Sequence, residues 1–134
     1  MQMEFHTAEE FSKIYKLRLS RVNEENFKEV LDFLTETFLE DRNVLSIFHA
    51  LNFTREEFIE LISLNLLDAK PWWENSRVVY DKNNKICLCY YGRDLFSIKR
   101  DPKMNPLKNP KLQFKRELDY ELLKPMLAKI SKIG

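Results

Sequence analysis

The first regular pattern in the chain is an alternation of polar and apolar residues along 15–22, which is typical of a half-buried β-strand. Leu17 and Leu19 fall on one face of this strand, and we expect that face to point into the core. Arg18 falls on the other face. The polar residues before the strand, 1–14, predict a loose or short helical lead-in.

Apolar residues then recur at helical spacing in three successive stretches. The first predicts an amphipathic helix that Asn23 can cap and that ends near Glu40. The second predicts a shorter helix over 44–51. Together they form a helical block directly after the first strand.

The third helix, predicted over 55–69, has the strongest local signal in the chain. Thr54 and Glu57 stand at the two positions of a capping box, in which each side chain bonds the backbone of the other residue. Trp72 and Trp73 follow the helix. We expect one of them to cap the core and the other to face a pocket or an interface.

Two stretches rich in β-branched and aromatic residues, 76–81 and 85–91, predict a pair of strands. The polar turn 82–84 between them contains two asparagines, which tolerate left-handed backbone geometry. The pair is therefore predicted to be an antiparallel hairpin. Gly92 is a candidate bulge, after which 95–98 continues or bends the second strand.

The C-terminal part begins with a proline-rich loop over 99–110. Residues 112–130 are helix-forming but are interrupted by Pro125, which predicts two short helices or one kinked helix.

These elements give the order β-α-α-α-β-β-α and predict an α+β fold, with three antiparallel strands and helices packed on the sheet. We expect one domain over 1–134, in which 1–14 is the lead-in, 15–98 the strand–helix–hairpin body and 99–134 a basic loop with C-terminal helices.

Composition fits a globular domain, because hydrophobic residues make up 44% of the chain and charged residues 32%, with a net charge of +1. That balance hides an asymmetry. Residues 1–98 carry 12 Lys and Arg against 17 Asp and Glu, a net of −5, whereas 99–134 carry 10 against 4, a net of +6. We expect the basic end to fold over the acidic body, and the alternative is that it meets a partner. No nucleic-acid fold signature accompanies it, so we expect no nucleic-acid binding.

Other partners and sites are limited by simple counts. No apolar run approaches the ~20 residues of a membrane span, and the first residues do not resemble a leader, so we expect a cytoplasmic protein without membrane contact. His6 and His49 are far apart, and Cys87 and Cys89 lack zinc-ligand spacing. We expect no metal site, two free cysteines packed in the core and a structural or surface His49.

The order of elements and two motifs resemble the N-terminal half of GNAT-type N-acetyltransferases, closest to the arylalkylamine N-acetyltransferase-like branch. The first motif is the acidic, phenylalanine-rich stretch 33–41, Phe-Leu-Thr-Glu-Thr-Phe-Leu-Glu-Asp. The second is the hairpin 78–86, Val-Val-Tyr-Asp-Lys-Asn-Asn-Lys-Ile. The resemblance covers about 15–130 and implies transfer of an acetyl group from acetyl-CoA to an amine.

The resemblance also implies where a site would lie. The first strands and helices of the family shape the amine pocket, for which Phe38, Asp41 and Tyr90 are the candidates here. Glu40 and Asp41 are the candidate catalytic acids. The alternative interpretation of this acidic cluster, which Glu36 joins, is a solvated helix face.

The sequence departs from the family pattern where chemistry depends on it. The family's acetyl-CoA signature, R/Q-x-x-G-x-G/A, is missing, and the chain has only two glycines, Gly92 and Gly134. Arg42 stands where the branch has a candidate general base, and a guanidinium cannot accept a proton. We therefore predict a partial, truncated domain, a pseudoenzyme that is inactive alone. It would hold no cofactor by itself, and acetyl-CoA only if the family activity is retained.

A second hypothesis comes from a different class of protein. Without a fourth strand, Ile86 to Ile98 would form a sheet edge with unpaired backbone amides. Such an edge favours a non-catalytic interaction module that pairs with a second copy in a homodimer or with a partner chain.

Overall fold

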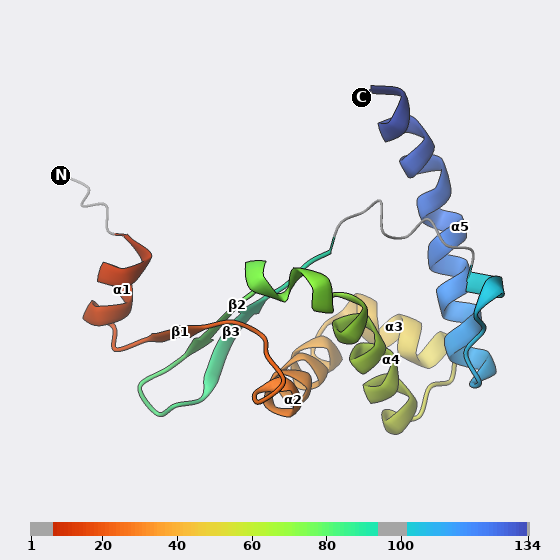
Figure 1. Ribbon diagram of the computed structural model, residues 1–134. Coiled ribbons are helices and arrows are strands. Elements are labelled where there is room, and N and C mark those ends of the chain that lie inside the picture. Colours follow the sequence, from red (N-terminus) through yellow and green to blue (C-terminus); the bar gives the residue numbers. More distant parts are fainter. Residues whose placement is uncertain (1–6, 94–101, 134) are drawn as a thin grey trace.

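The computed structural model describes residues 7–93 and 102–133, and its fold is α+β with one antiparallel sheet (Figure 1). The sheet lies toward the N-terminal end of the molecule, and the helices α2, α3 and α4 stand beside it. The elements in chain order are α1 (Ala8–Ile14), β1 (Arg18–Ser20), α2 (Phe27–Leu39), α3 (Arg42–Ala50), α4 (Arg55–Asp68), the 3-10 helix η1 (Lys70–Asn75), β2 (Arg77–Tyr80), β3 (Ile86–Tyr90), the 3-10 helix η3 (Pro102–Met104) and α5 (Pro110–Ile133).

The sheet has the order β1-β2-β3, and both pairings are antiparallel. Residues that pair across strands share a face, so the register sorts the side chains. Val78 pairs with both Ser20 and Cys89 on the face that α2 covers. Val79 pairs with both Leu19 and Leu88 on the opposite face.

The core lies between the covered face of the sheet and the helices α2 and α4. Its buried apolar side chains come from α2, α4, η1, β2, α5 and the segments beside them: Val22, Val30, Leu34, Phe53, Phe58, Ile62, Leu66, Ala69, Trp73, Val78, Tyr80 and Leu112. The indole Nε1 of Trp73 donates a hydrogen bond to the carbonyl oxygen of Leu66 at 3.0 Å, which satisfies the one polar atom of that side chain. Trp73 is the core tryptophan expected from the sequence, and Trp72 is half-buried.

The first strand is shorter than predicted, and its buried face is the reverse of the expected one. Leu19 is 40% exposed on the uncovered face, whereas the guanidinium of Arg18 lies 3.9 Å from the ring centroid of Tyr80 on the other face. Arg18 also donates to Asn84 Oδ1 at 2.6 Å. A cation placed over an aromatic ring and bonded to an amide gains contacts that a leucine cannot make. Lys16, with a φ of 56°, breaks the extended backbone before the strand.

Asn23 does not cap α2, because the helix begins four residues later. Asn23 and Asn26 instead accept hydrogen bonds from each other's backbone N–H groups, both at 2.9 Å. This reciprocal pair holds a turn over the two glutamates between them. The N-cap residue is Asn26. Asparagine's ability to close a local turn therefore outweighs its capping role here.

The third helix agrees with its prediction. Thr54 Oγ1 accepts from the Glu57 N–H at 3.1 Å, and Glu57 Oε1 accepts from the Thr54 N–H at 3.0 Å, so the capping box is confirmed. Phe53 and Phe58, which flank the box, are both buried. The ring of Phe48 contacts both of them.

The hairpin turn is confirmed in detail. Asn84 has a φ of 62°, in the left-handed region that the sequence predicted for this turn. Asp81 Oδ1 accepts from the backbone N–H groups of Asn83 and Lys85. The irregularity in the ladder lies between Val79 and Tyr80 rather than at Gly92. The predicted continuation over 95–98 lies outside the described residues.

The C-terminal segment forms one helix, α5, which continues through Pro125 rather than ending there. Pro102–Met104 adds a short 3-10 helix within the loop predicted over 99–110. Across the described ranges, the structure contains no helix that combines the length and the apolarity needed to cross a bilayer.

Candidate interaction surface

One face of the sheet is uncovered in the described part of the chain and carries large apolar side chains. We call it the open face and define it by Leu19, Val79, Leu88 and Tyr90. The first three form a row across all three strands, and Tyr90 follows Leu88 at the next position on the same side of β3. Leu88 is 52% exposed and Tyr90 63% exposed. Contiguous apolar surface of this kind typically marks a contact site.

The outer edge of β3 adjoins the open face. β3 pairs with β2 on one side only, and no further strand pairs with it among residues 7–93 and 102–133. Its sequence, Ile-Cys-Leu-Cys-Tyr, contains no charge and no proline, the features that usually protect an edge strand from pairing. The edge is therefore open to strand addition.

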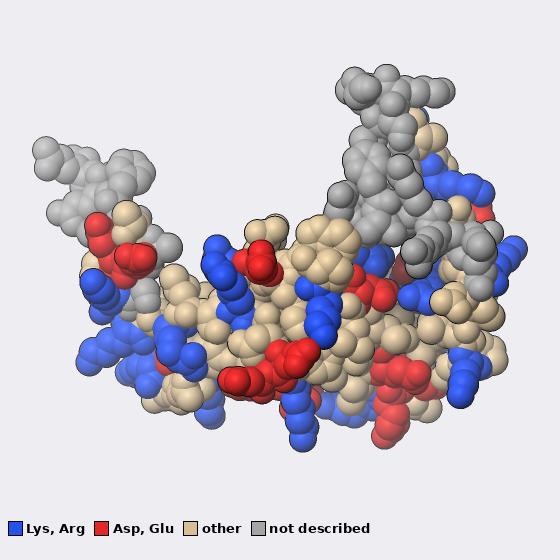
Figure 2. Space-filling view, viewed as in Figure 1, with Lys and Arg blue, Asp and Glu red and all other residues tan. Residues whose placement is uncertain are grey.

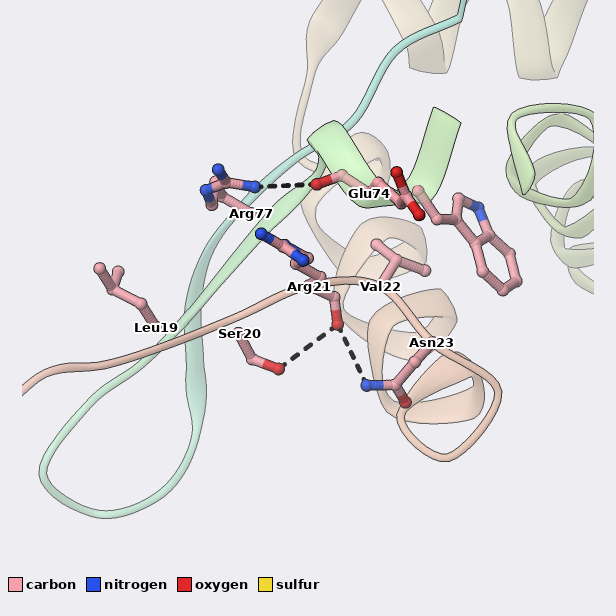
Figure 3. A pocket seen from close by; sticks show the side chains of 8 residues that line it. Leu19, Ser20, Arg21, Val22, Asn23, Glu74 and Arg77 are labelled. Carbon is pink, nitrogen blue, oxygen red and sulfur yellow. Dashed lines mark hydrogen bonds between the residues drawn. The ribbon is translucent and has the colours of Figure 1, made fainter. Parts of the chain in front are cut away.

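A shallow hollow of about 630 Å³ lies at the other end of the open face, beside β1 (Figure 3). Arg21 and Arg77 point to the same side of β1 as Leu19, whereas Ser20 points away. Arg77 Nη1 donates to the carbonyl oxygens of Glu74 and Ser76. Two guanidinium groups and the carboxylate of Glu74 line the hollow, so it adds a net positive charge to the rim of an apolar surface.

Basic and acidic side chains gather in different parts of the visible face of the molecule (Figure 2). Lys and Arg side chains predominate over the end that carries the hairpin, and Asp and Glu side chains gather nearer the middle and the α4 end. Exposed basic residues of the sheet and its turn are Arg18, Arg77, Lys82 and Lys85.

The sequence-predicted pocket residues do not share one surface. Asp41 caps α3, because its Oδ1 accepts from the N–H groups of Asn43 and Val44. Glu40 is exposed at the end of α2, and Phe38 packs partly against the core. Tyr90 belongs to the open face, on the side of the sheet away from α2. The structure brings Glu40 and Asp41 together but separates them from Tyr90.

The neighbouring acidic residue Glu36 forms an exposed ion pair with Arg55. An exposed pair of this kind contributes little to stability. It does show that the acidic cluster on α2 meets a basic group of the same chain.

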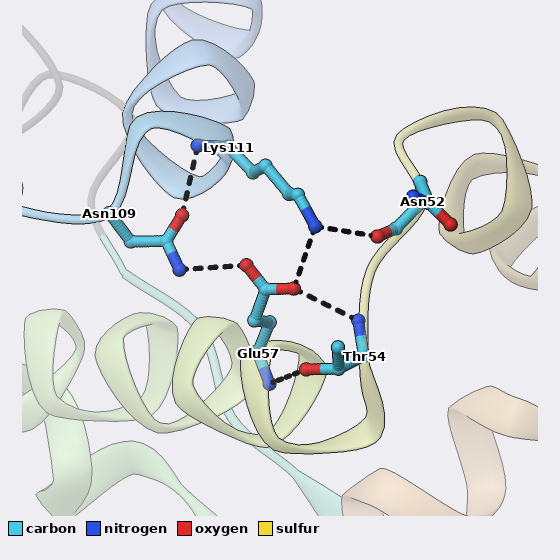
Figure 4. A network of polar contacts seen from close by, with 5 residues as sticks. All are labelled: Asn52, Thr54, Glu57, Asn109 and Lys111. Atoms are coloured by element: carbon cyan, nitrogen blue, oxygen red, sulfur yellow. Dashed lines mark hydrogen bonds and ion pairs between the residues drawn. The ribbon is translucent and has the colours of Figure 1, made fainter.

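A network of hydrogen bonds centres on the carboxylate of Glu57 (Figure 4). This carboxylate accepts from Asn109 Nδ2 at 2.8 Å and from Lys111 Nζ at 2.9 Å, in addition to the Thr54 N–H. Lys111 Nζ also donates to the carbonyl oxygen of Asn52 at 2.8 Å. The hydrogen bond from Asn109, followed by those from Thr54 and Lys111, lowers the pKa of Glu57 from 4.5 to about 2. The network ties the start of α4 to the start of α5.

A groove of about 610 Å³ separates α4 and α5 farther along. Asp68 Oδ2 accepts from Arg93 at 3.4 Å and from Arg116 at 3.2 Å across it. Trp72 and Tyr120 line its walls. Both Lys111 and Arg116 therefore connect the basic C-terminal segment to acidic groups of the body, as the charge asymmetry predicted.

The two cysteines differ in environment. Both thiols are free. Cys89 packs against the core, and its burial raises the pKa of the thiol to about 11. Cys87 is exposed, so the prediction of a core position is wrong for that residue. The bulge between Val79 and Tyr80 explains the difference, because it places Cys87 outside the regular alternation of β3.

No group of three or more His, Cys, Asp and Glu side chains that could hold a metal ion occurs in the portion of the chain that the structure describes. His49 is exposed, on the surface as expected.

Sequence reasoning identified the edge of β3 but not the open face. The sequence does not indicate that Leu19 and Val79 belong to the open face, and its alternation predicts Leu19 in the core. Only the pairing register shows that they form one row with Leu88. Comparison of the chain with protein-family models, with curated proteins and with solved structures found no match.

Proposed function

We propose that the protein is a non-catalytic, GNAT-like interaction module that associates with other polypeptides through its three-stranded sheet. The observation that carries the proposal is the uncharged strand β3, which within 7–93 and 102–133 pairs on one side only and borders an apolar face that no described element covers. A strand from a second copy or from a partner chain would extend the sheet by main-chain hydrogen bonds, and the apolar row would supply side-chain contacts.

The GNAT-like part of the proposal rests on the sequence motifs and on an element order that agrees with the family's first half. In that family the fourth strand and the helix after it hold acetyl-CoA. The present sequence has no R/Q-x-x-G-x-G/A motif to supply the backbone amides that bind a pyrophosphate. We therefore propose that the chain corresponds to the amine-substrate half and does not transfer acetyl groups by itself.

The dispersal of the candidate pocket supports the absence of catalysis. Asp41 uses a carboxylate oxygen to cap α3, and Arg42 takes the position of the family's candidate base. A general base must lie within hydrogen-bond reach of the proton that it abstracts, so it has to share a surface with the side chains that bind the substrate. Glu40 remains as an exposed carboxylate on the opposite side of the sheet from Tyr90.

The binding half of the proposal is tested by placing a charge on the edge. Cys87→Lys places an ammonium group at an exposed position of β3. Ser46→Lys places the same group at an exposed position of α3 and serves as the control. We expect sedimentation velocity to show concentration-dependent association for the unmodified protein and the control, and at least a tenfold weaker association for Cys87→Lys. Where a partner chain supplies the strand, we expect a pull-down to recover the partner with the unmodified protein and with the control, and much less of it with Cys87→Lys. Equal behaviour of all three proteins would refute edge pairing.

The catalytic half is tested with acetyl-CoA. We expect no change in the melting temperature of the purified protein with saturating acetyl-CoA, and no acetylation of an arylalkylamine. A ligand that binds the native state and is present at a concentration of a hundred times its dissociation constant would stabilise that state by ~2.7 kcal/mol, which is readily measured. Such a shift, or any turnover, would show that the protein is not the inactive domain proposed here.

A further inference from the structure

A second apolar surface that no other described element covers lies on α5. We call it the α5 stripe and define it by Phe114, Leu118, Leu122 and Met126, which follow one another at intervals of four residues. Residues at this spacing lie on one side of a helix. Their side chains are 54%, 41%, 67% and 50% exposed. A helix with one such stripe normally buries it against another element.

The α5 stripe does not cover the open face of its own chain. α5 stands at the C-terminal end of the molecule, and the sheet stands at the opposite end, with α2, α3 and α4 between them (Figure 1). The first turns of α5 are fixed to α4 by buried Leu112 and by the contacts of Lys111 and Arg116. One chain therefore presents a helix stripe and a sheet face that do not meet.

The two surfaces match in size. The stripe extends over 12 helical steps from Phe114 to Met126, which is ~18 Å at the rise of an α-helix. The open face is three strands wide, or ~14 Å from the outer side of the first strand to the outer side of the third. β3, its longest strand, has five residues and a length of ~17 Å. A helix laid on a sheet is one of the common two-layer arrangements of protein domains.

Both segments are basic overall, but charges at the rims of the two surfaces match locally. Glu117 and Glu121 follow Phe114 and Leu118 by three residues, so they flank the stripe on α5. Arg21 and Arg77 flank the open face beside Leu19. A helix docked with Glu117 and Glu121 toward β1 would place their carboxylates near the guanidinium groups of the rim, which favours one orientation over the reverse.

From these observations we propose that the occupant of the open face is a second copy of this chain, whose α5 stripe packs against it. Two copies make the contact reciprocally, so that each chain gives its α5 to its partner's sheet and receives the partner's α5 on its own. Both surfaces are used once in each chain, and the assembly closes as a two-fold dimer. The proposal shares the sheet with the proposed function but does not require the edge of β3.

The test uses two variants of the full chain that each damage one surface. Leu88→Asp places a carboxylate on the open face, and Leu122→Asp places one on the α5 stripe. Both side chains are more than half exposed, so neither variant should impair folding, which circular dichroism and thermal melting check. Ile47→Asp, on exposed α3, is the matched control. We expect the dimer dissociation constant of each variant alone to be at least tenfold higher than that of the control.

Mixing the two variants distinguishes the reciprocal contact from other dimers. The Leu122→Asp chain keeps an intact open face, and the Leu88→Asp chain keeps an intact α5 stripe, so one of the two contacts reforms in the mixture. We expect sedimentation velocity of the equimolar mixture to show dimers that neither variant forms alone at the same concentration. A dimer that pairs face to face or helix to helix cannot give this recovery.

Two results would overturn the inference: dimers that survive either single substitution, or a mixture that stays monomeric. Neither result decides whether the main chain of β3 pairs at its edge, which Cys87→Lys tests separately. If Cys87→Lys still abolishes association in that case, the proposed function stands and only the reciprocal contact falls. If the mixture recovers while Cys87→Lys has no effect, the reciprocal contact stands and edge pairing falls.

Discussion

Replacing Leu66 by alanine tests whether the core is assembled as the structure shows. Leu66 is completely buried in α4, and its neighbour Leu67 is 45% exposed on the same helix. The two residues have the same side chain and the same helix propensity. A difference between Leu66→Ala and Leu67→Ala therefore reports burial alone.

The expected magnitude follows from what each substitution removes. Leucine to alanine deletes three carbon groups, each worth ~0.8 kcal/mol when it is buried, so Leu66→Ala loses about 2.4 kcal/mol from transfer. The cavity left among its neighbours adds to this, for a total of about 3–5 kcal/mol. Leu67→Ala loses only about half of the transfer contribution, ~1 kcal/mol, because solvent already reaches the side chain and no closed cavity forms.

The assay is urea denaturation followed by far-ultraviolet circular dichroism, with the slope compared between variants so that changes in the denatured state are recognised. A domain of this size can lose most of its stability from 3–5 kcal/mol, so Leu66→Ala is expected to be partly unfolded at 37 °C. If Leu67→Ala proves as destabilising as Leu66→Ala, then α4 does not present the face to the core that its burial pattern indicates.

Two further predictions concern titratable groups. The Asn109 hydrogen bond and the other contacts lower the pKa of Glu57 to about 2, so the stability that they contribute is complete above about pH 4.5 and is lost as the pH falls through about 2. Glu57→Gln should therefore flatten the dependence of the unfolding free energy on pH in that window, measured by urea denaturation at a series of pH values. An aromatic disulfide reagent at pH 8 should modify exposed Cys87 rapidly and Cys89 slowly, because Cys89 is half-buried and has its pKa raised to about 11. Cys87→Ser should remove the fast phase, and a fast phase that persists in this variant would contradict the assignment.

Local signals in the sequence predicted local structure well. The capping box that defines the start of α4 spans only the four residues from Thr54 to Glu57. The asparagines of the hairpin turn likewise determine its geometry through their local backbone preference. The α+β class and the three-stranded sheet followed from the order of such segments.

Long-range partners could not be predicted in the same way. The orientation of β1 depends on Arg18 meeting Tyr80 and Asn84, which lie more than sixty residues farther along the chain. The alternation of apolar residues alone favours the opposite face. Likewise, Asn109 and Lys111 reach Glu57 across more than fifty residues, so nothing near Glu57 in the sequence indicates its lowered pKa.

The same limit applies to the candidate site. A resemblance places residues along a chain, but the pairing of strands decides which side of a sheet each one faces. Tyr90 pairs with Arg77 on the open face, and this separates it from the acidic end of α2. The exposed apolar row became visible only when the register joined three strands.

The ion pairs that hold α5 to the body lie near its N-terminal end, and the helix continues well beyond them. The ion pairs that join α5 to α4, through Lys111 and Arg116, and the buried Leu112 lie in its first two turns, and Tyr120 and Leu123 line the groove beside α4 in the next two. From Arg116 to the end at Ile133 the helix extends roughly 25 Å farther. A tilt of about 10° at the anchored turns would move the far end by roughly 4 Å at this helix rise. A change in the ion pairs of Glu57 and Asp68 that tilted these turns would therefore be amplified along the helix toward Ile133.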